Sequence, residues 1–329
     1  MLLTIFRKSY YIQIGWLLVF GIIFASPSFL FEQTLQESNE TIFLKITKFP
    51  SLLLNPWIYH SLCWTLLLVL VFYIKALLTK HHLVHHSNFL PALIIIALFG
   101  FQHPFSLALI SILGLFFMAI AYSYLLQSFE DEKADNSIFS ASLMIGIASL
   151  FSYHFSLFII LVWISFFVFQ NYSWRYFPIT IIGLITPYLF LITWLFWTDQ
   201  MQLLESNYQF IQQHFYSFPK FNSIFEIVTI SLLGFFIFIS LARIIPEIPG
   251  KIIAIRKKTS LSLWFFLVSL IPFLFSSDII IKNIVLIPLS GLLGYYLRMV
   301  KRKVMVIDFL FTALIIILLF QKYYLIYAG

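Results

Sequence analysis

Long runs of apolar residues recur along the whole chain, and short polar segments separate them. A transmembrane helix needs about 20 mainly apolar residues to cross a hydrocarbon layer about 30 Å thick. Only 10% of the 329 residues are charged, whereas soluble domains carry roughly 25%. A soluble enzyme, a disordered regulator, a DNA-binding module and a disulfide-rich secreted domain are therefore excluded. The sequence predicts an all-α, polytopic membrane protein. Its eleven candidate spans are about 9–31, 58–78, 88–102, 105–127, 137–152, 155–171, 177–197, 224–245, 260–277, 279–297 and 305–325.

Two pairs of these spans are separated by very little polar sequence. Gln102-His103-Pro104 divides the first pair, and Ser152-Tyr153-His154 divides the second. The alternative is one long bent helix over each of 88–127 and 137–171. Two separate spans are favoured because each region has about 35–40 residues, whereas one straight helix needs only about 20.

The basic residues predict the orientation, since lysine and arginine concentrate in cytoplasmic loops. If 137–171 were one helix, the clusters at 243–258 and 298–303 would face outward, so paired spans are favoured again. With the N-terminus in the cytoplasm, eleven spans place the C-terminus outside. The inner segments then hold fifteen of the twenty basic residues: Arg7, Lys8, Lys75, Lys80, Lys133, Arg175, Arg243, Lys251, Arg256, Lys257, Lys258, Arg298, Lys301, Arg302 and Lys303. The outer segments hold Lys45, Lys48, Lys220, Lys282 and Lys322.

Residues 1–329 are predicted to form a single transmembrane domain. The two longest outer loops, about 32–57 and 198–223, carry apolar and aromatic residues that favour a position along the membrane surface. The net charge of +7 lies in the short inner loops, where it determines topology, so nucleic acid is not an expected partner.

The segment between Ile138 and Leu191 carries the most distinctive pattern. It contains a small-residue run at Gly146–Leu150, the turn Ser173-Trp174-Arg175, and the run Gly183–Tyr188. This pattern resembles a family of multi-spanning inner-membrane proteins of unknown function from Bacteroidetes-type bacteria. Ser173 stands where the family pattern has asparagine. The resemblance implies a bacterial inner-membrane location and carries no activity with it.

A second, looser pattern combines short paired helices after the second span with a small-residue helix and a basic inner turn. It resembles the polyprenol-dependent glycosyltransferases of the GT-C superfamily. That resemblance implies a GT-C-like fold, an outer active site, and an acidic residue in the first outer loop as base or metal ligand. Here the loop offers Glu32, Glu37 and Glu40. The Asp-x-Asp type of motif is absent from the sequence.

Several outer residues are therefore candidates for a site. Glu32 directly follows the first span, where a carboxylate can accept a proton or bind a divalent cation; the alternative is a solvated loop acid. Glu37 and Glu40 are three residues apart and would share a helix face. Imidazoles lining the site are predicted from the outer histidines, which could equally be interfacial residues: His60, His103, His154 and His214.

Other candidates lie on the inner side. Lipid phosphate or headgroups are predicted to contact Trp174 and Arg175, and also the cluster Arg256-Lys257-Lys258, unless these residues only anchor the chain and fix its topology. His81, His82, His85 and His86 would form i,i+4 pairs on a helix, the spacing of a metal site, or a weakly basic flank of the second span.

Ionisable residues within the spans are few. Glu226 and Asp308 lie near span ends, which argues against an ion-coupled transporter. The sequence thus favours an inner-membrane protein, GT-C-like, that handles a lipid-linked (polyprenyl) sugar at the outer face, with membrane lipids and polyprenyl phosphate as partners. The alternative is a non-catalytic subunit or scaffold of an envelope-biogenesis or secretion complex with membrane-protein partners.

Overall fold

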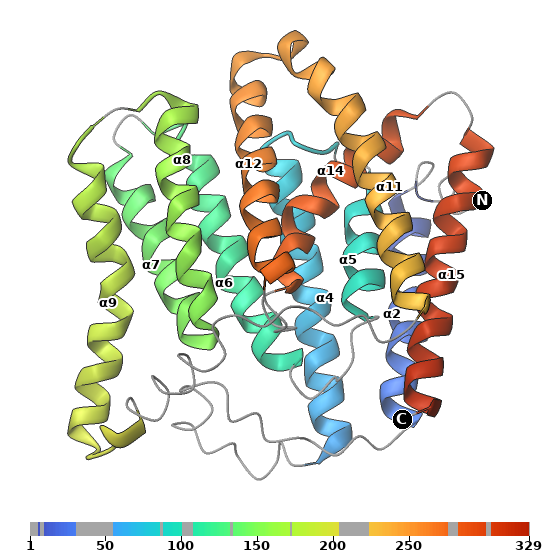
Figure 1. Ribbon diagram of the computed structural model, residues 1–329, viewed down its shortest axis with the longest axis horizontal. Helices are drawn as coiled ribbons and strands as arrows, with labels where there is room; N and C mark the ends of the chain where they lie inside the picture. Colours follow the sequence, from blue (N-terminus) through green and yellow to red (C-terminus); the bar gives the residue numbers. More distant parts are fainter. Residues whose placement is uncertain are drawn as a thin grey trace.

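The described part of the chain is a bundle of eleven α-helices (Figure 1). The structure, a computed structural model, describes Phe6 and residues 10–30, 55–85, 88–100, 108–131, 134–171, 173–203, 224–275, 282–300 and 304–328. No strand occurs in these ranges. The helices are α2 (Tyr10–Leu30), α4 (Pro56–Lys80), α5 (Leu90–Gly100), α6 (Ala108–Gln127), α7 (Asp135–Phe151), α8 (Ile159–Phe169), α9 (Tyr176–Trp197), α11 (Ile224–Glu247), α12 (Ile253–Phe275), α14 (Leu286–Met299) and α15 (Val304–Ala328). Three short 3-10 turns join them: η3 (Tyr153–Phe158), η4 (Ile248–Gly250) and η5 (Asn283–Val285).

Each of the eleven predicted spans overlaps one of these helices. The two short pairs are separate helices: α5 is followed by α6, and α7 by α8 through η3. The single bent helices over 88–127 and 137–171 are therefore excluded. By length and composition, five helical segments can cross a membrane: Trp57–Lys80, Leu109–Gln127, Tyr176–Trp197, Ile227–Gly250 and Met305–Tyr323. The architecture is compatible with an α-helical membrane protein, and the count of eleven spans stays a prediction.

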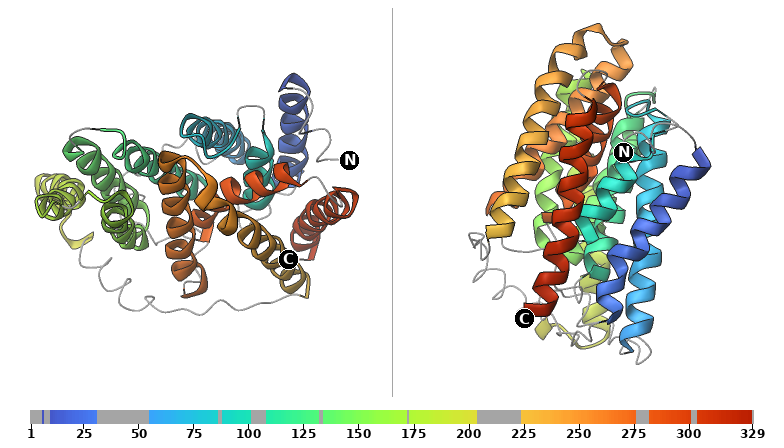
Figure 2. Two further views of the ribbon diagram at one scale, coloured as in Figure 1. Left: turned by 90° about the horizontal axis from the view of Figure 1, so that it is seen from above. Right: turned by 90° about the vertical axis from the view of Figure 1, so that its right-hand side faces the viewer.

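Successive helices run in opposite directions between the two ends of the bundle (Figures 1 and 2). α2 begins at the upper end of Figure 1 and α15 finishes at the lower end. If every helix crosses the membrane, the upper end is cytoplasmic, because the basic segments predicted to lie inside connect the helices there.

This orientation predicts the result of reporter fusions. Alkaline phosphatase fused after residue 329 should be active, and green fluorescent protein fused there should be dark, because the eleven-span topology predicts that the C-terminus lies outside. Fusions truncated within 300–303 should show the reverse pattern. A C-terminal fusion that fluoresces in the cytoplasm would contradict the eleven-span topology.

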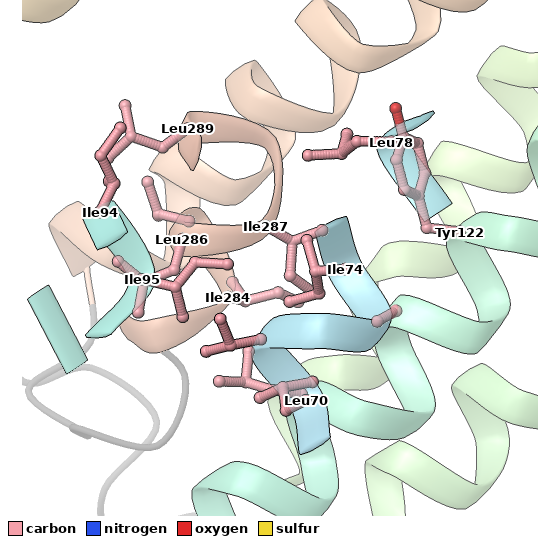
Figure 3. Packing of buried hydrophobic residues seen from close by; sticks show 14 of the residues in the cluster. Leu70, Ile74, Leu78, Ile94, Ile95, Tyr122, Ile284, Leu286, Ile287 and Leu289 are labelled. Carbon is pink, nitrogen blue, oxygen red and sulfur yellow. The ribbon is translucent and has the colours of Figure 1, made fainter. Parts of the chain in front are cut away.

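α5 lies in the middle of the bundle and is buried on every side. All of residues 91–99 are buried, as expected for a helix that is apolar all round. Asn88 accepts a hydrogen bond from Leu90 N (3.1 Å) and donates one to Gly294 O of α14 (2.8 Å). A Cβ at Gly294 would lie 2.5 Å from Pro91 Cγ, so glycine permits the close contact of α5 and α14. Around these helices, Leu70 and Ile74 of α4 pack with Ile95 and Ile287 (Figure 3).

The two motif runs singled out in the sequence pack against each other. Gly146 of α7 lies against Leu184 and Pro187 of α9, and a Cβ at Gly146 would come within 2.7 Å of Leu184 O. Tyr188 OH donates to Ser149 Oγ at 2.7 Å. Small residues let two helix backbones approach closely. The motif positions therefore hold α9 at the edge of the bundle (Figure 1).

Candidate functional site

A groove of about 510 Å³ lies between the lower halves of α2 and α4. The α2 residues that line the groove are spaced three and four residues apart, so their side chains lie on one face of the helix. Gly21 and Ala25 are small, and a Cβ at Gly21 would meet only Leu68 Cδ2, at 3.9 Å. The small residues thus leave space that the two helices do not fill. The groove is lined by Leu18, Gly21, Ile22, Ala25, Ser26, Ser61, Trp64 and Leu68.

One end of the groove is polar. Ser26 Oγ donates a hydrogen bond to Ile23 O (2.8 Å). In a regular helix this carbonyl would accept from the N–H of residue 27, but Pro27 has no N–H. Ser26 Oγ also lies 2.8 Å from Tyr323 OH of α15. Because the single Ser26 proton points to Ile23 O, Tyr323 donates to Ser26. These contacts join α2 to α15 beside the groove.

Lys322 is the main functional candidate that sequence reasoning missed. The sequence placed it in an outer segment, but its side chain is only 2% exposed in α15. Nζ donates to Phe24 O at 2.6 Å and lies 5.5 Å from the centroid of the Trp64 ring. Asp308, near the start of the same helix, is also buried. The sequence placed Asp308 near a span end and Lys322 in an outer segment, whereas both side chains are buried in the bundle.

Most of the predicted outer site falls outside the described residues: Glu32, Glu37, Glu40, His103 and His214. The segment 31–54, which carries Glu32, Glu37 and Glu40, connects Leu30 of α2 to the start of α4. The two walls of the groove are thus the two helices that flank the predicted catalytic loop.

His60 and His154 are the two outer histidines that the structure describes. His60 is buried on α4, one turn before Trp64, and interacts electrostatically with Lys322. His154 is buried at the corner between α7 and α8. Its ring stacks on the Tyr153 ring, with 3.8 Å between the two ring centroids. Within the described ranges, no group of three or more His, Cys, Asp or Glu residues could hold a metal ion. A divalent cation at Glu32 stays a prediction.

The predicted headgroup residues differ in their exposure. Trp174 is 77% exposed, and Arg175 and Arg256 are exposed as well. Lys257 donates to Phe169 O (3.1 Å) and to Gln170 Oε1 (3.0 Å). Lys258 is buried inside the bundle. The structure therefore presents Trp174, Arg175 and Arg256 to the surroundings, whereas Lys257 and Lys258 have internal partners.

Lys258 lies between two other titratable groups at the upper end. It forms an ion pair with Glu130, which follows α6, and its Nζ lies 3.2 Å from His81 Nδ1. The pKa of His81 is lowered to about 4, mainly by burial and to a smaller extent by the positive charge of Lys258. The hydrogen bond from Lys258 lowers the pKa of Glu130. This cluster joins the end of α4, the α6–α7 turn and α12.

The histidine run after α4 does not form the helical pairs considered from its spacing. α4 finishes at Lys80, and His82 has a positive φ of 58°. His81 is buried, whereas His82 and His85 are exposed. Because the chain turns here, His81 and His85 do not share a helix face, and His86 lies outside the described residues.

Together, these features define an apolar helical bundle with a groove between two helices and buried ionisable groups at both ends. Comparison with known proteins finds no matching family model, no matching curated protein and no matching solved structure.

Proposed function

We propose that this chain is an inner-membrane protein that handles a lipid-linked sugar at the lower, outer end of the bundle. The observation that carries the proposal is the groove between α2 and α4. A membrane-bound substrate has to enter from the side, between helices, and this groove is apolar along most of its length. Its volume falls within the roughly 300–1,000 Å³ of ordinary ligand pockets.

The loop that joins the groove walls supplies the candidate chemistry. In the sequence, Glu32 comes two residues after the end of α2, the helix that forms one wall of the groove. In the transfer, an acceptor hydroxyl attacks the anomeric carbon of the sugar, and the bond to the polyprenyl phosphate breaks. The Glu32 carboxylate takes the hydroxyl proton, and the phosphate leaves as an anion. A divalent cation held by the same loop would neutralise that anion.

Replacing Glu32 with glutamine tests this role. The amide cannot accept the proton, so sugar transfer should fall about 100-fold or more, the usual range for loss of a general base. The measurement is transfer of radiolabelled sugar from a polyprenyl phosphate donor in proteoliposomes. Glu205→Gln, in the other outer loop, is the matched control and should keep full activity. Wild-type transfer rates in Glu32→Gln at equal protein level would remove Glu32 from catalysis.

A scaffold role is the second candidate, and the surface of α9 favours it. One side of this helix is held by α7, and large apolar residues stay exposed on the others, among them Phe190, Trp194 and Trp197. Such a surface suits partner helices as well as lipid. Gentle purification followed by native mass spectrometry separates the two candidates: a bound polyprenyl lipid supports transfer, and a second protein at fixed stoichiometry supports the scaffold.

A further inference from the structure

The hairpin that joins α11 to α12 projects beyond the rest of the upper end of the bundle. Residues 243–256, which we call the upper hairpin, contain the end of α11, the turn η4 and the first turn of α12. Figures 1 and 2 show its tip above the upper ends of α4, α6, α8 and α15. Lys257 Nζ donates a hydrogen bond to the carbonyl of Phe169, the last residue of α8, so the base of the hairpin is level with the end of α8.

The tip has the depth of the lipid headgroups in a bilayer that these helices cross. The first turn of α12, Ile253–Arg256, extends about 6 Å beyond Lys257. Each headgroup layer outside the hydrocarbon core is about 5–8 Å thick. Lys80 at the end of α4 and Glu130 after α6 are exposed near the base of the hairpin, which is where the hydrocarbon core has to end. Side chains at the tip therefore meet headgroups.

Contacts with α14 fix the position of the upper hairpin. Glu247 Oε2 accepts a hydrogen bond from Tyr295 OH of α14 (3.1 Å), and Glu247 Oε1 forms an ion pair with Arg243 Nε (3.1 Å). Lys251 Nζ lies 4.1 Å from the centroid of the Tyr295 ring. The hairpin is therefore held by the bundle, and the side chains that it exposes have a defined place at the upper surface.

The upper hairpin carries an excess of positive charge. Three basic residues, Arg243, Lys251 and Arg256, and one acidic residue, Glu247, give it a net charge of +2. The Arg243 side chain is 66% exposed although it pairs with Glu247. Within the described ranges, no hydrogen-bond acceptor binds the charged groups of Lys251 and Arg256. Lysine has three N–H donors and arginine has five, so donors remain for the oxygens of a phosphate.

Large apolar side chains are exposed next to these charges. Ile245, Ile252 and Ile253 are 54%, 73% and 60% exposed. Exposed apolar groups beside basic ones are typical of segments that lie in a membrane interface, where the apolar groups enter the lipid surface and the basic groups meet anionic headgroups. An acidic soluble protein would match the charges as well. Lipid is favoured because the tip already lies at headgroup depth.

We propose that the upper hairpin is a binding surface for anionic phospholipid of the surrounding bilayer. The basic residues Arg243, Lys251 and Arg256 contact the lipid phosphates, and Ile252 and Ile253 enter the lipid surface between them. The surface goes beyond the proposed function, because it lies at the opposite end of the bundle from the lower half of the α2–α4 groove and takes a different lipid.

The surface also differs from the headgroup cluster predicted from the sequence. Of Arg256, Lys257 and Lys258, only Arg256 belongs to it, since the two lysines bind Phe169 O and Glu130 inside the protein. The other basic members come from the α11 side of the hairpin, which the sequence pattern did not connect with this cluster.

Quenching of a fluorophore at the tip tests this proposal in the full-length protein. Cys63, the single cysteine of the chain, is buried and is replaced by alanine, and Ile252→Cys then carries an NBD label. The protein is placed in phosphatidylcholine nanodiscs that contain a small share of doxyl-labelled phosphatidylglycerol or of doxyl-labelled phosphatidylcholine. Each basic side chain near an anionic surface strengthens the attraction about fivefold. Half-quenching should therefore need at least tenfold less of the anionic quencher than of the zwitterionic one.

Charge variants show whether the hairpin causes this preference. Replacing Arg243 and Arg256 together with glutamine should make the two quenchers equally effective. Replacing both with lysine keeps the charge and should keep the preference, which guards against a folding defect in the glutamine variant. Lys80→Gln removes an exposed charge at the end of α4 and is the matched control, which should keep the preference. A label at Phe238→Cys, on an exposed site within α11, should be quenched equally by both lipids.

Two results would overturn the proposal in different ways. Equal quenching of the tip label by both lipids would show that the hairpin lies in the bilayer without selecting negative charge. No quenching by either lipid would place the tip in water and favour a soluble partner instead. The assay contains no polyprenyl lipid and no sugar, so neither result depends on the proposed function.

Discussion

Valine in place of Gly183 is expected to detach α9 from α7 and to destabilise that edge of the bundle. Any Cβ at this position would lie 2.0 Å from Ser142 Oγ and 3.0 Å from the backbone oxygen of Phe139. The serine hydroxyl can rotate away, but the Phe139 carbonyl belongs to α7 and can move only with its helix. Overpacking a tight contact costs about 1–3 kcal/mol. We expect a loss at the upper end of this range, because valine adds two methyl groups beyond the Cβ.

The effect should be confined to one part of the molecule. α9 packs mainly on α7, and most of its other side chains are exposed. Hydrogen exchange in detergent should therefore speed up in Tyr176–Trp197 in Gly183→Val, with little change in α5 and α14.

Gly234→Val is the matched control for this prediction. It makes the same change within α11, at a glycine whose added Cβ would meet nothing within 4 Å. It carries the same change in helix propensity without the steric clash. If α9 exchanged its amide hydrogens as slowly in Gly183→Val as in the wild type, the close contact of α7 and α9 would not be needed to hold α9.

The positions of the helices could be predicted from the sequence because the length of an apolar run is a local property. The predicted run 177–197 and the helix Tyr176–Trp197 agree within one residue. The division of 137–171 also followed from local sequence, since its length exceeds one span and polar residues occur at its centre. Glycine spacing at Gly146 and Gly183 marked a distinctive region, although the sequence did not show that these residues face each other.

The direction in which each side chain points could not be predicted. Lys322 and Lys258 lie near helix ends, where a lysine can extend to water or turn into the bundle. Their burial depends on partners far away in the chain, Phe24 for Lys322 and Glu130 for Lys258. His81 could not be distinguished from His85 for the same reason. The groove was also hidden, because it depends on which faces of α2 and α4 meet rather than on any motif.

Stability in detergent is expected to fall as the pH is lowered from about 6.5 to about 4, and His81 is the cause. His81 follows the last residue of α4, and the groups that face it are Lys258, Glu130, Lys80 and His82. In the folded protein its pKa is about 4, whereas the unfolded value is 6.5. Above pH 6.5 both states are neutral, and the group has no effect. Below pH 6.5, His81 binds a proton in the unfolded state but stays neutral in the folded state. Folding therefore becomes less favourable as the pH falls.

The size of this effect follows from the pKa difference, since one unit corresponds to about 1.4 kcal/mol. The loss should reach about 3 kcal/mol near pH 4. Glu130 adds to it at lower pH, because its lowered pKa stabilises the fold above the unfolded value of 4.5, and this stabilisation is lost as the pH falls further. Both groups therefore act in the same direction, in two successive pH ranges.

Replacing His81 with glutamine should remove the loss of stability between pH 6.5 and 4. The loss at lower pH, which Glu130 causes, should remain. Glutamine keeps an acceptor for Lys258 Nζ but has no proton to gain between pH 6.5 and 4. Melting temperatures recorded every half pH unit by intrinsic fluorescence give the profile. His85→Gln, an exposed histidine four residues away, is the control and should keep the wild-type slope. A wild-type slope in His81→Gln would place the acid sensitivity elsewhere, whereas a flat profile would show that burial beside Lys258 keeps His81 neutral and ties α12 to the end of α4.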